Sequence, residues 1–289
     1  MRRGFVYLFL IILFTLFNFY YRPVKGNPLV TKEYKSSSAY INNLYMSDEY
    51  FKENLVPKKY WYVYDEMVED LKEGKDHDVI NCKEMSCIDS FYSIYHSLYL
   101  DHPEFLMFQG MSAKEKKYQI EPHYYHLNKV QNYFGERRIE REIDIIKKET
   151  KNMNDKEKII YVYEYVAGHQ YDRLFMYSMG NQSAYSFFTK KSSVCAGFAK
   201  ASQIIFQNIG IKSYPVLSDD HMWNYVEYEG KYYVFDATVG ASYINKKNDL
   251  FYEGLGRTTI GQNTGLYKNL YPEIEETPLQ ELFGLKKSK

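Results

Sequence analysis

Apolar residues recur at helical spacing in several parts of the chain. Such spacing is found over residues 40–71, 88–100, 137–151 and 156–167. The first of these stretches is interrupted near Pro57, and Asn154 or Asp155 is placed to cap the last. Short runs rich in aromatic side chains, residues 105–111 and 118–125, predict strands. The first half of the chain is therefore expected to be mainly helical, with short strands.

The most informative stretch begins at Ser192 and Ser193, which are favoured N-cap residues of helices. Apolar residues follow at helical spacing until Gly210, a residue typical of the position just after a helix. Cys195 is therefore expected in the first turn of an amphipathic helix, where free N–H groups and the helix dipole favour a thiolate. Small residues beside it are expected to leave room for a substrate backbone: Ala196, Gly197 and Ala199.

Three strands are expected next, over residues 211–217, 222–228 and 231–236. A two-residue turn at Glu229-Gly230 joins the last two and places Trp223 opposite Asp236. His221 lies two residues from Trp223, so it points to the same face of the sheet as Asp236. A carboxylate in that position can hold an imidazole in one tautomer. A shift of one residue in the turn would instead put the two side chains on opposite faces.

Each of these residues has an ordinary structural explanation on its own. A single cysteine on a helix is usually a small buried residue. A single histidine is more often structural, and an aspartate can simply end a strand. Their joint placement favours chemistry instead, with Cys195 as a thiol nucleophile, His221 as its base and Asp236 as the residue that orients the base.

Three motifs carry a resemblance to a known family: residues 194–199 (Val-Cys-Ala-Gly-Phe-Ala), His221-x-Trp223-Asn224 and Asp236-Ala237-Thr238. They resemble the core motifs of the transglutaminase-like superfamily, most closely its bacterial exported branch. The resemblance covers roughly residues 95–245 and also includes Asp101-His102-Pro103-Glu104-Phe105, Tyr171-Asp172 and Ser183-Ala184-Tyr185.

The resemblance implies a papain-like α+β fold, in which a cysteine-bearing helix packs on an antiparallel sheet that carries the histidine and the aspartate. It implies Cys195 as nucleophile, His221 as general base and Asp236 as orienter. In the family the segment with Gln170 and Tyr171 runs beside the cysteine. Either residue is thus a candidate donor to an oxyanion, although we favour packing as their role. His102 is interpreted as structural.

The chain departs from the family pattern near the expected site. Met222 stands where the family usually has alanine, and Phe198 replaces a common tyrosine. Val239-Gly240 follow the third motif, where a tryptophan and an acidic residue are frequent. These differences leave the three site residues in place and concern the shape of the substrate and acyl-acceptor clefts.

Residues 1–26 predict export. Arg2 and Arg3 precede a nearly continuous apolar run over residues 5–21, which is typical of a signal peptide or of a retained membrane anchor. Both alternatives place the rest of the chain outside the cytoplasm, secreted or on the outer face of the membrane. Residues 27–39 are expected to be a linker.

Cys82 and Cys87 remain once Cys195 is assigned to the site. Export favours oxidation, so we favour a disulfide between them over two free thiols. No zinc site is expected, and His123 and His126 lack an acidic or thiol partner. We expect no metal and no cofactor. The formal net charge of +0 gives no reason to expect a nucleic-acid partner.

The predicted organisation is therefore a helical region with short strands over 40–150, a transglutaminase-like core over 151–245 and a C-terminal loop and tail over 246–289. The predicted function is that of an exported thiol enzyme that acts on protein or peptide amides, including cell-wall peptide, through a thioester on Cys195. A protease, a deamidase and a transamidase share such a triad. The alternative is a non-catalytic surface module that binds peptide or wall polymer on the same fold.

Overall fold

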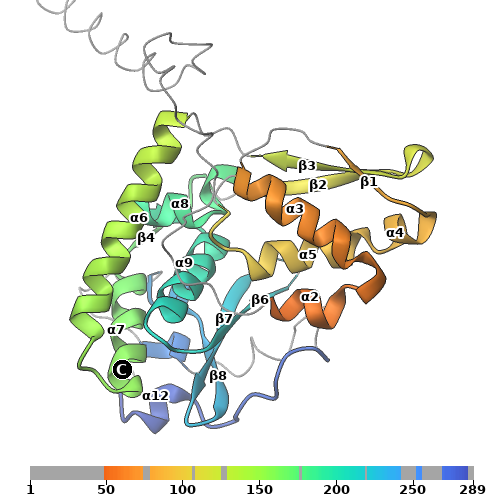
Figure 1. Ribbon diagram of the computed structural model, residues 1–289. Helices are drawn as coiled ribbons and strands as arrows, with labels where there is room; N and C mark the ends of the chain where they lie inside the picture. Colours follow the sequence, from red (N-terminus) through yellow and green to blue (C-terminus); the bar gives the residue numbers. More distant parts are fainter. Residues whose placement is uncertain are drawn as a thin grey trace, which may run out of the picture.

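The structure of the protein is a computed structural model (Figure 1). It describes residues 49–73, 79–105, 108–124, 129–175, 178–218, 220–241, 252–255 and 269–285. The signal peptide or anchor predicted over 1–26 and the linker over 27–39 lie outside the described residues, as does His126. Within these ranges, no helix combines the length and the apolar character needed to cross a membrane.

The first part of the described chain is mainly helical. Its helical segments are α2 (Tyr50–Leu55), η2 (Lys58–Tyr60), α3 (Trp61–Glu73), α4 (Met85–Asp89) and α5 (Phe91–Asp101). The interruption expected near Pro57 separates α2 from α3, and Val56 is extended, as a residue before proline prefers to be. The single helix expected over 88–100 is wrong in its start, because the chain divides at Ser90 between α4 and α5.

A small antiparallel sheet follows these helices. It is formed by β1 (Ile80–Asn81), β2 (Phe108–Lys114) and β3 (Gln119–Tyr124) in the order β1-β3-β2, with the 3-10 turn η3 (Glu115–Lys117) between the last two. Both strands predicted from the aromatic runs are present, although β2 begins three residues later than expected. Ile80 and Ile120 pair across the sheet and are fully buried against the helices.

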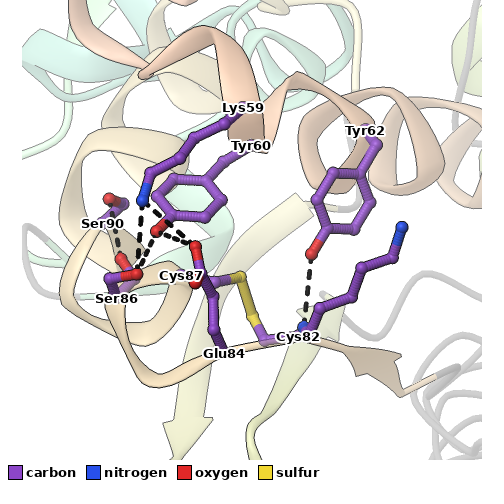
Figure 2. Close-up of a disulfide and its surroundings, with 9 residues drawn as sticks. Lys59, Tyr60, Tyr62, Cys82, Glu84, Ser86, Cys87 and Ser90 are labelled. Carbon is purple, nitrogen blue, oxygen red and sulfur yellow. Dashed lines mark hydrogen bonds and ion pairs between the residues drawn. A yellow bond between two sulfur atoms is a disulfide. The ribbon is translucent and has the colours of Figure 1, made fainter.

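Figure 2 shows the disulfide between Cys82 and Cys87. Both cysteines are buried in the same apolar cluster as α3 and α5. Beside them, the Tyr60 hydroxyl and the Lys59 ammonium bind the Glu84 carboxylate at 2.8 and 3.1 Å (Figure 2). The disulfide favoured from the sequence is therefore present, and Cys195 is left as a free thiol.

The second part of the chain is built around one buried helix. Its described residues include the helices α6 (Lys129–Thr150), α7 (Asp155–Ala167), α8 (Ala184–Lys190) and α9 (Cys195–Asn208). Helix α6 begins eight residues before the predicted start. Asn154 caps α7, because its side chain accepts the Glu157 N–H at 3.0 Å while the Glu157 carboxylate accepts the Asn154 N–H at 2.9 Å.

Helix α9 is enclosed on all sides, which corrects the expectation of an amphipathic helix. Every residue from Ala196 to Asn208 is buried. Helices α6, α7 and α8 pack on one side of α9, and a sheet packs on the other (Figure 1). The buried residues include polar ones as well as apolar ones, among them Lys200, Gln203 and Asn208.

The C-terminal end of α9 agrees with the prediction from the sequence, and its N-terminal end does not. Gly210 has a φ of +77°, and the Ile211 N–H returns to the Phe206 carbonyl at 2.9 Å, so the predicted C-terminal stop is confirmed. The predicted serine caps are wrong, because the N-cap is Val194. The two serines form β5 (Ser192–Ser193), which pairs in parallel with β4 (Gln170–Tyr171).

The sheet on α9 is antiparallel, with strands in chain order: β6 (Ser213–Leu217), β7 (Met222–Tyr228) and β8 (Lys231–Phe235). Glu229 and Gly230 both have positive φ, at 51° and 75°, which matches the twist that a two-residue hairpin requires. Tyr228 pairs with Lys231 as predicted, so the register that the site depends on is confirmed.

The predicted fold class is confirmed: the molecule is α+β, and its cysteine-bearing helix packs on an antiparallel sheet. Phe206 of α9 meets Phe235 of β8 edge to face, with ring centroids 4.8 Å apart. The remaining described elements are η4 (Met179–Asn181), η5 (Tyr252–Leu255) and α12 (Leu279–Leu282). Residues 237–241 are helical. The domain boundaries stay predictions.

Candidate active site

Cys195 is the first residue of α9, directly after β5. The chain before it is held by Asn181, whose carbonyl accepts the Ser193 hydroxyl at 2.6 Å and the Val194 N–H at 3.3 Å. The thiol itself is partly exposed. Cys195 is thus presented at the N-terminal end of a buried helix, where helix N–H groups favour a thiolate.

His221 and Asp236 meet as the predicted hairpin register requires. The imidazole Nε2 and the Asp236 Oδ2 are 2.8 Å apart. The Asp236 carboxylate is only 1% exposed, and its other oxygen, Oδ1, accepts the Thr238 N–H at 3.1 Å and the Thr238 hydroxyl. Since Asp236 occupies Nε2, the ring nitrogen that remains for another partner is Nδ1.

His221 is the main partner that favours the thiolate form of Cys195. Burial raises the pKa of the thiol, but the hydrogen bond and the charge of His221, together with the N–H groups of Met222 and Ala196, lower it below the ordinary value. Burial acts against the charged imidazole as well, yet Asp236 and Cys195 raise the pKa of His221 to about 10. The two shifts together favour a thiolate–imidazolium pair at neutral pH.

Tyr171 is a further side chain in contact with the cysteine. Its hydroxyl interacts with the backbone and with the side chain of Cys195. Burial, and then the charge of Cys195, raise the pKa of Tyr171 to about 12, so the hydroxyl keeps its proton. The ring packs near Phe198, with centroids 6.0 Å apart. Tyr171 thus packs as expected and also directs a hydroxyl at the sulfur.

A segment distant in sequence supports Asp236. The Asp236 N–H donates to the Gly254 carbonyl at 2.8 Å, and the Gly254 N–H donates to the Tyr163 hydroxyl at 3.2 Å. A Cβ added to Gly254 would lie 1.9 Å from the Asp236 carbonyl oxygen, so only glycine fits there. Turn η5 and α7 therefore fix the backbone that carries the carboxylate.

The strand of the histidine is attached to the helix of the cysteine. The Asn224 amide, fully buried, donates to the Ala199 carbonyl at 3.1 Å. The Trp223 ring lies nearly parallel to the His221 ring, with centroids 5.7 Å apart. These two contacts give physical roles to the Trp-Asn part of the second motif, which the sequence alone did not explain.

The small residues of α9 do not have the expected role. Ala196 and Ala199 are buried in an apolar cluster, and a Cβ on Gly197 would lie 1.9 Å from the Ser193 hydroxyl. They make room for neighbouring parts of the protein rather than for a substrate. Met222 is buried in the same cluster as the alanines.

Other predicted residues lie apart from this site. His102 is buried and bonded through Nδ1 to the Glu104 carboxylate at 2.7 Å, as a structural residue would be. Gln170 pairs with Ser192 and is exposed. In the described part of the chain, no group of three or more His, Cys, Asp and Glu side chains is arranged to hold a metal ion.

The structure thus brings Cys195, His221 and Asp236 together on the helix and the sheet expected of the family. The fold is α+β, with the cysteine at the start of a helix that packs on an antiparallel sheet. Sequence reasoning missed the support from Gly254 and Tyr163, because nothing in the motifs links residue 254 to residue 236. It favoured packing over oxyanion binding as the role of Tyr171, whereas the hydroxyl of Tyr171 also interacts with Cys195.

No protein-family model and no curated protein sequence matches the chain. Among solved structures, a candidate cysteine protease from Cytophaga hutchinsonii is 19% identical with a TM-score of 0.30, and the match covers 35% of this chain and 37% of that chain. A protein named as a TGase is 16% identical with a TM-score of 0.33, over 42% of this chain and 41% of that chain. The chain spans less than half the length of either structure.

Proposed function

We propose that this protein is a thiol enzyme that transfers the acyl group of an amide through Cys195. The observation that carries the proposal is the 2.8 Å contact between His221 and Asp236, together with the lowered pKa that His221 gives to the Cys195 thiol. A nucleophile, a base and a residue that orients the base are the parts that covalent catalysis by a thiol needs.

The proposed reaction begins with attack of the Cys195 thiolate on the carbonyl carbon of the amide. The tetrahedral intermediate collapses when the C–N bond breaks and the His221 imidazolium gives its proton to the leaving nitrogen. A thioester and a neutral imidazole result. Water or an amine then attacks the thioester, His221 accepts the proton of the attacking group, and the thiolate leaves.

The Tyr171 hydroxyl is the donor that we propose for the oxyanion. In the resting pair it interacts with the side chain and the backbone of Cys195. During attack the negative charge passes from the sulfur to the carbonyl oxygen, which is two bonds away in the tetrahedral intermediate, and the same hydroxyl is proposed to donate to it. A donor fixed beside that position stabilises the charge as it develops.

Export is part of the proposal. The apolar run over residues 5–21 and the disulfide between Cys82 and Cys87 support it, because disulfides persist mainly in oxidising compartments. Protein or peptide amides outside the cytoplasm, including those of cell-wall peptide, are the proposed substrates.

The decisive experiment is a mass-spectrometric screen of glutamine-containing peptides with a primary amine. The reference is Cys195→Ala, which lacks the nucleophile. Peptide-bond hydrolysis, deamidation and amine incorporation each leave a different mass change, so one experiment identifies the acyl acceptor. Products formed equally by Cys195→Ala would contradict a thioester on this residue. Peptide binding without turnover would favour the non-catalytic surface module.

A further inference from the structure

We infer that Leu174 and Phe175, called here the apolar ledge, form the contact surface for an apolar side chain of the substrate beside the reacting amide. This inference rests on the proposed function and specifies the class of its substrate. The ledge follows β4, and none of the three sequence motifs includes it.

Both side chains of the apolar ledge face solvent. Leu174 is 89% exposed and Phe175 is 62% exposed, which makes Leu174 the most exposed large apolar side chain in the described part of the chain. Single apolar residues on a surface are ordinary, but two adjacent large ones beside a candidate site are a typical feature of a binding surface.

The backbone of the ledge is held in place by the side chains of Asp172 and Asn181. Asp172 Oδ1 accepts the N–H groups of Leu174 and Phe175 at 3.1 and 3.0 Å, and Asp172 Oδ2 accepts the Asn181 amide at 2.9 Å. The same amide donates to the Phe175 carbonyl at 3.2 Å. Asn181 is itself 3% exposed. The ledge is therefore a fixed turn, and a preorganised surface binds at a lower entropic cost.

Strand pairing places the ledge at the same end of the molecule as the thiol. β4 and β5 are parallel, with Tyr171 beside Ser193, and the Asp172 N–H donates to the Ser193 carbonyl at 2.8 Å. Segments that follow two parallel strands leave at the same edge. One of them leads to Cys195 and the other to the ledge, and Tyr171, which interacts with Cys195, is the last residue of the strand before the ledge.

The chemistry of the ledge selects an apolar substrate group. Its nearest carboxylate, Asp172, already accepts three hydrogen bonds within the turn, so it offers little to a cationic ligand. The two side chains themselves offer only apolar surface. A peptide whose carbonyl lies at Cys195 would therefore be favoured when a residue next to the reacting amide carries a leucine- or phenylalanine-like side chain.

The test uses two peptides that share one reacting amide and differ in a single neighbouring residue, phenylalanine or serine. The full chain is compared with Leu174→Ser/Phe175→Ser and with the control Tyr92→Ser, which changes an aromatic residue of 68% exposure on α5. We expect wild type and control to prefer the phenylalanine peptide by about tenfold or more in kcat/KM, and the double variant to lose that preference through KM.

Binding of the same peptides to Cys195→Ala, with and without the ledge substitutions, separates the ledge from the proposed function. If the phenylalanine peptide binds more tightly only when the ledge is intact, and wild type does not turn it over, the proposed enzymatic function is rejected and the inference about the ledge is supported. A preference that the double variant retains would overturn the inference. The inference would also be overturned if the ledge substitutions reduced self-association, or reduced binding to phosphatidylglycerol vesicles, without changing the reaction with either peptide. Alkylation of Cys195 in every variant reports whether the site is intact.

Discussion

At the level of single residues, the charge of Cys195 depends on His221. Because only a thiolate is alkylated, the lowered thiol pKa should make Cys195 react with iodoacetamide at pH 6–7, below the range of an ordinary thiol near 8.5. In His221→Ala the thiol keeps its burial and loses its main stabilising partner, so its pKa should rise and its rate at pH 7 should fall about tenfold or more. Rate constants measured from pH 5 to 10 give both profiles. Identical profiles would show that the two side chains do not share a proton.

Tyr171 allows a test of the oxyanion donor that keeps the packing of its ring. Tyr171→Phe removes the hydroxyl beside Cys195 and leaves the contact with Phe198. The expected loss is about 10²-fold to 10³-fold in kcat/KM, mostly in kcat, as for other oxyanion donors. Tyr92→Phe removes an exposed hydroxyl on α5 and serves as the control. Equal activity of the two variants would assign Tyr171 to packing alone.

At the scale of elements, η5 is predicted to position the aspartate although it lies outside all three motifs. In Gly254→Ala the new Cβ would collide with the Asp236 carbonyl, so η5 or residue 236 must move and the bond to His221 should lengthen. We expect a loss of turnover and of rapid Cys195 alkylation at pH 7.

The matched control for Gly254→Ala is Gly284→Ala. Gly284 has a φ of +67° and nothing near an added Cβ, so alanine there should cost about 1 kcal/mol of stability and leave the alkylation of Cys195 unchanged. Thermal unfolding and alkylation are measured on both. If both variants alkylate at the wild-type rate, η5 does not hold Asp236.

Local sequence signals predicted the elements that local chemistry determines. The turn at Glu229-Gly230 set the register of β7 and β8, and Gly210 ended α9 as expected. The prediction of serine N-caps was wrong because a tertiary contact takes up the Ser193 hydroxyl, which donates to the Asn181 carbonyl twelve residues earlier. The contact between Gly254 and Asp236 has no local signal at all, since it joins segments that only the folded chain brings together.

At the scale of the whole molecule, the N-terminal helices are packed into the layer that carries the site. Phe51 of α2 and Leu100 of α5 belong to the same buried cluster as Ala199 and Trp223. The Gln203 amide of α9 donates to the Leu100 carbonyl at 3.0 Å. The helix of the cysteine is thus supported from both parts of the chain, and its stability should respond to substitutions in the contact between α5 and α9.

Lys200 lies in that contact and should make stability depend on pH. It is 4% exposed on α9, its Nζ is 3.5 Å from the centroid of the Tyr99 ring, and burial lowers its pKa to about 7. The same group in an unfolded chain has a pKa of about 10.4. Between these values the unfolded chain holds a proton that the folded chain has released, so stability should rise as the pH rises from 7 towards 10.

Lys200→Met keeps an unbranched chain in the contact and removes the amine. The variant should be more stable than wild type at pH 7, by of the order of 1–4 kcal/mol, because it avoids the deprotonation of a buried lysine. That difference should shrink as the pH approaches 10, where the unfolded wild type also loses its proton. Urea unfolding at pH 7, 8.5 and 10 measures it, with the exposed Lys116→Met as control. A difference that stays constant over this range would mean that Lys200 remains charged in the folded contact, where the charge of Glu104 favours its protonated form.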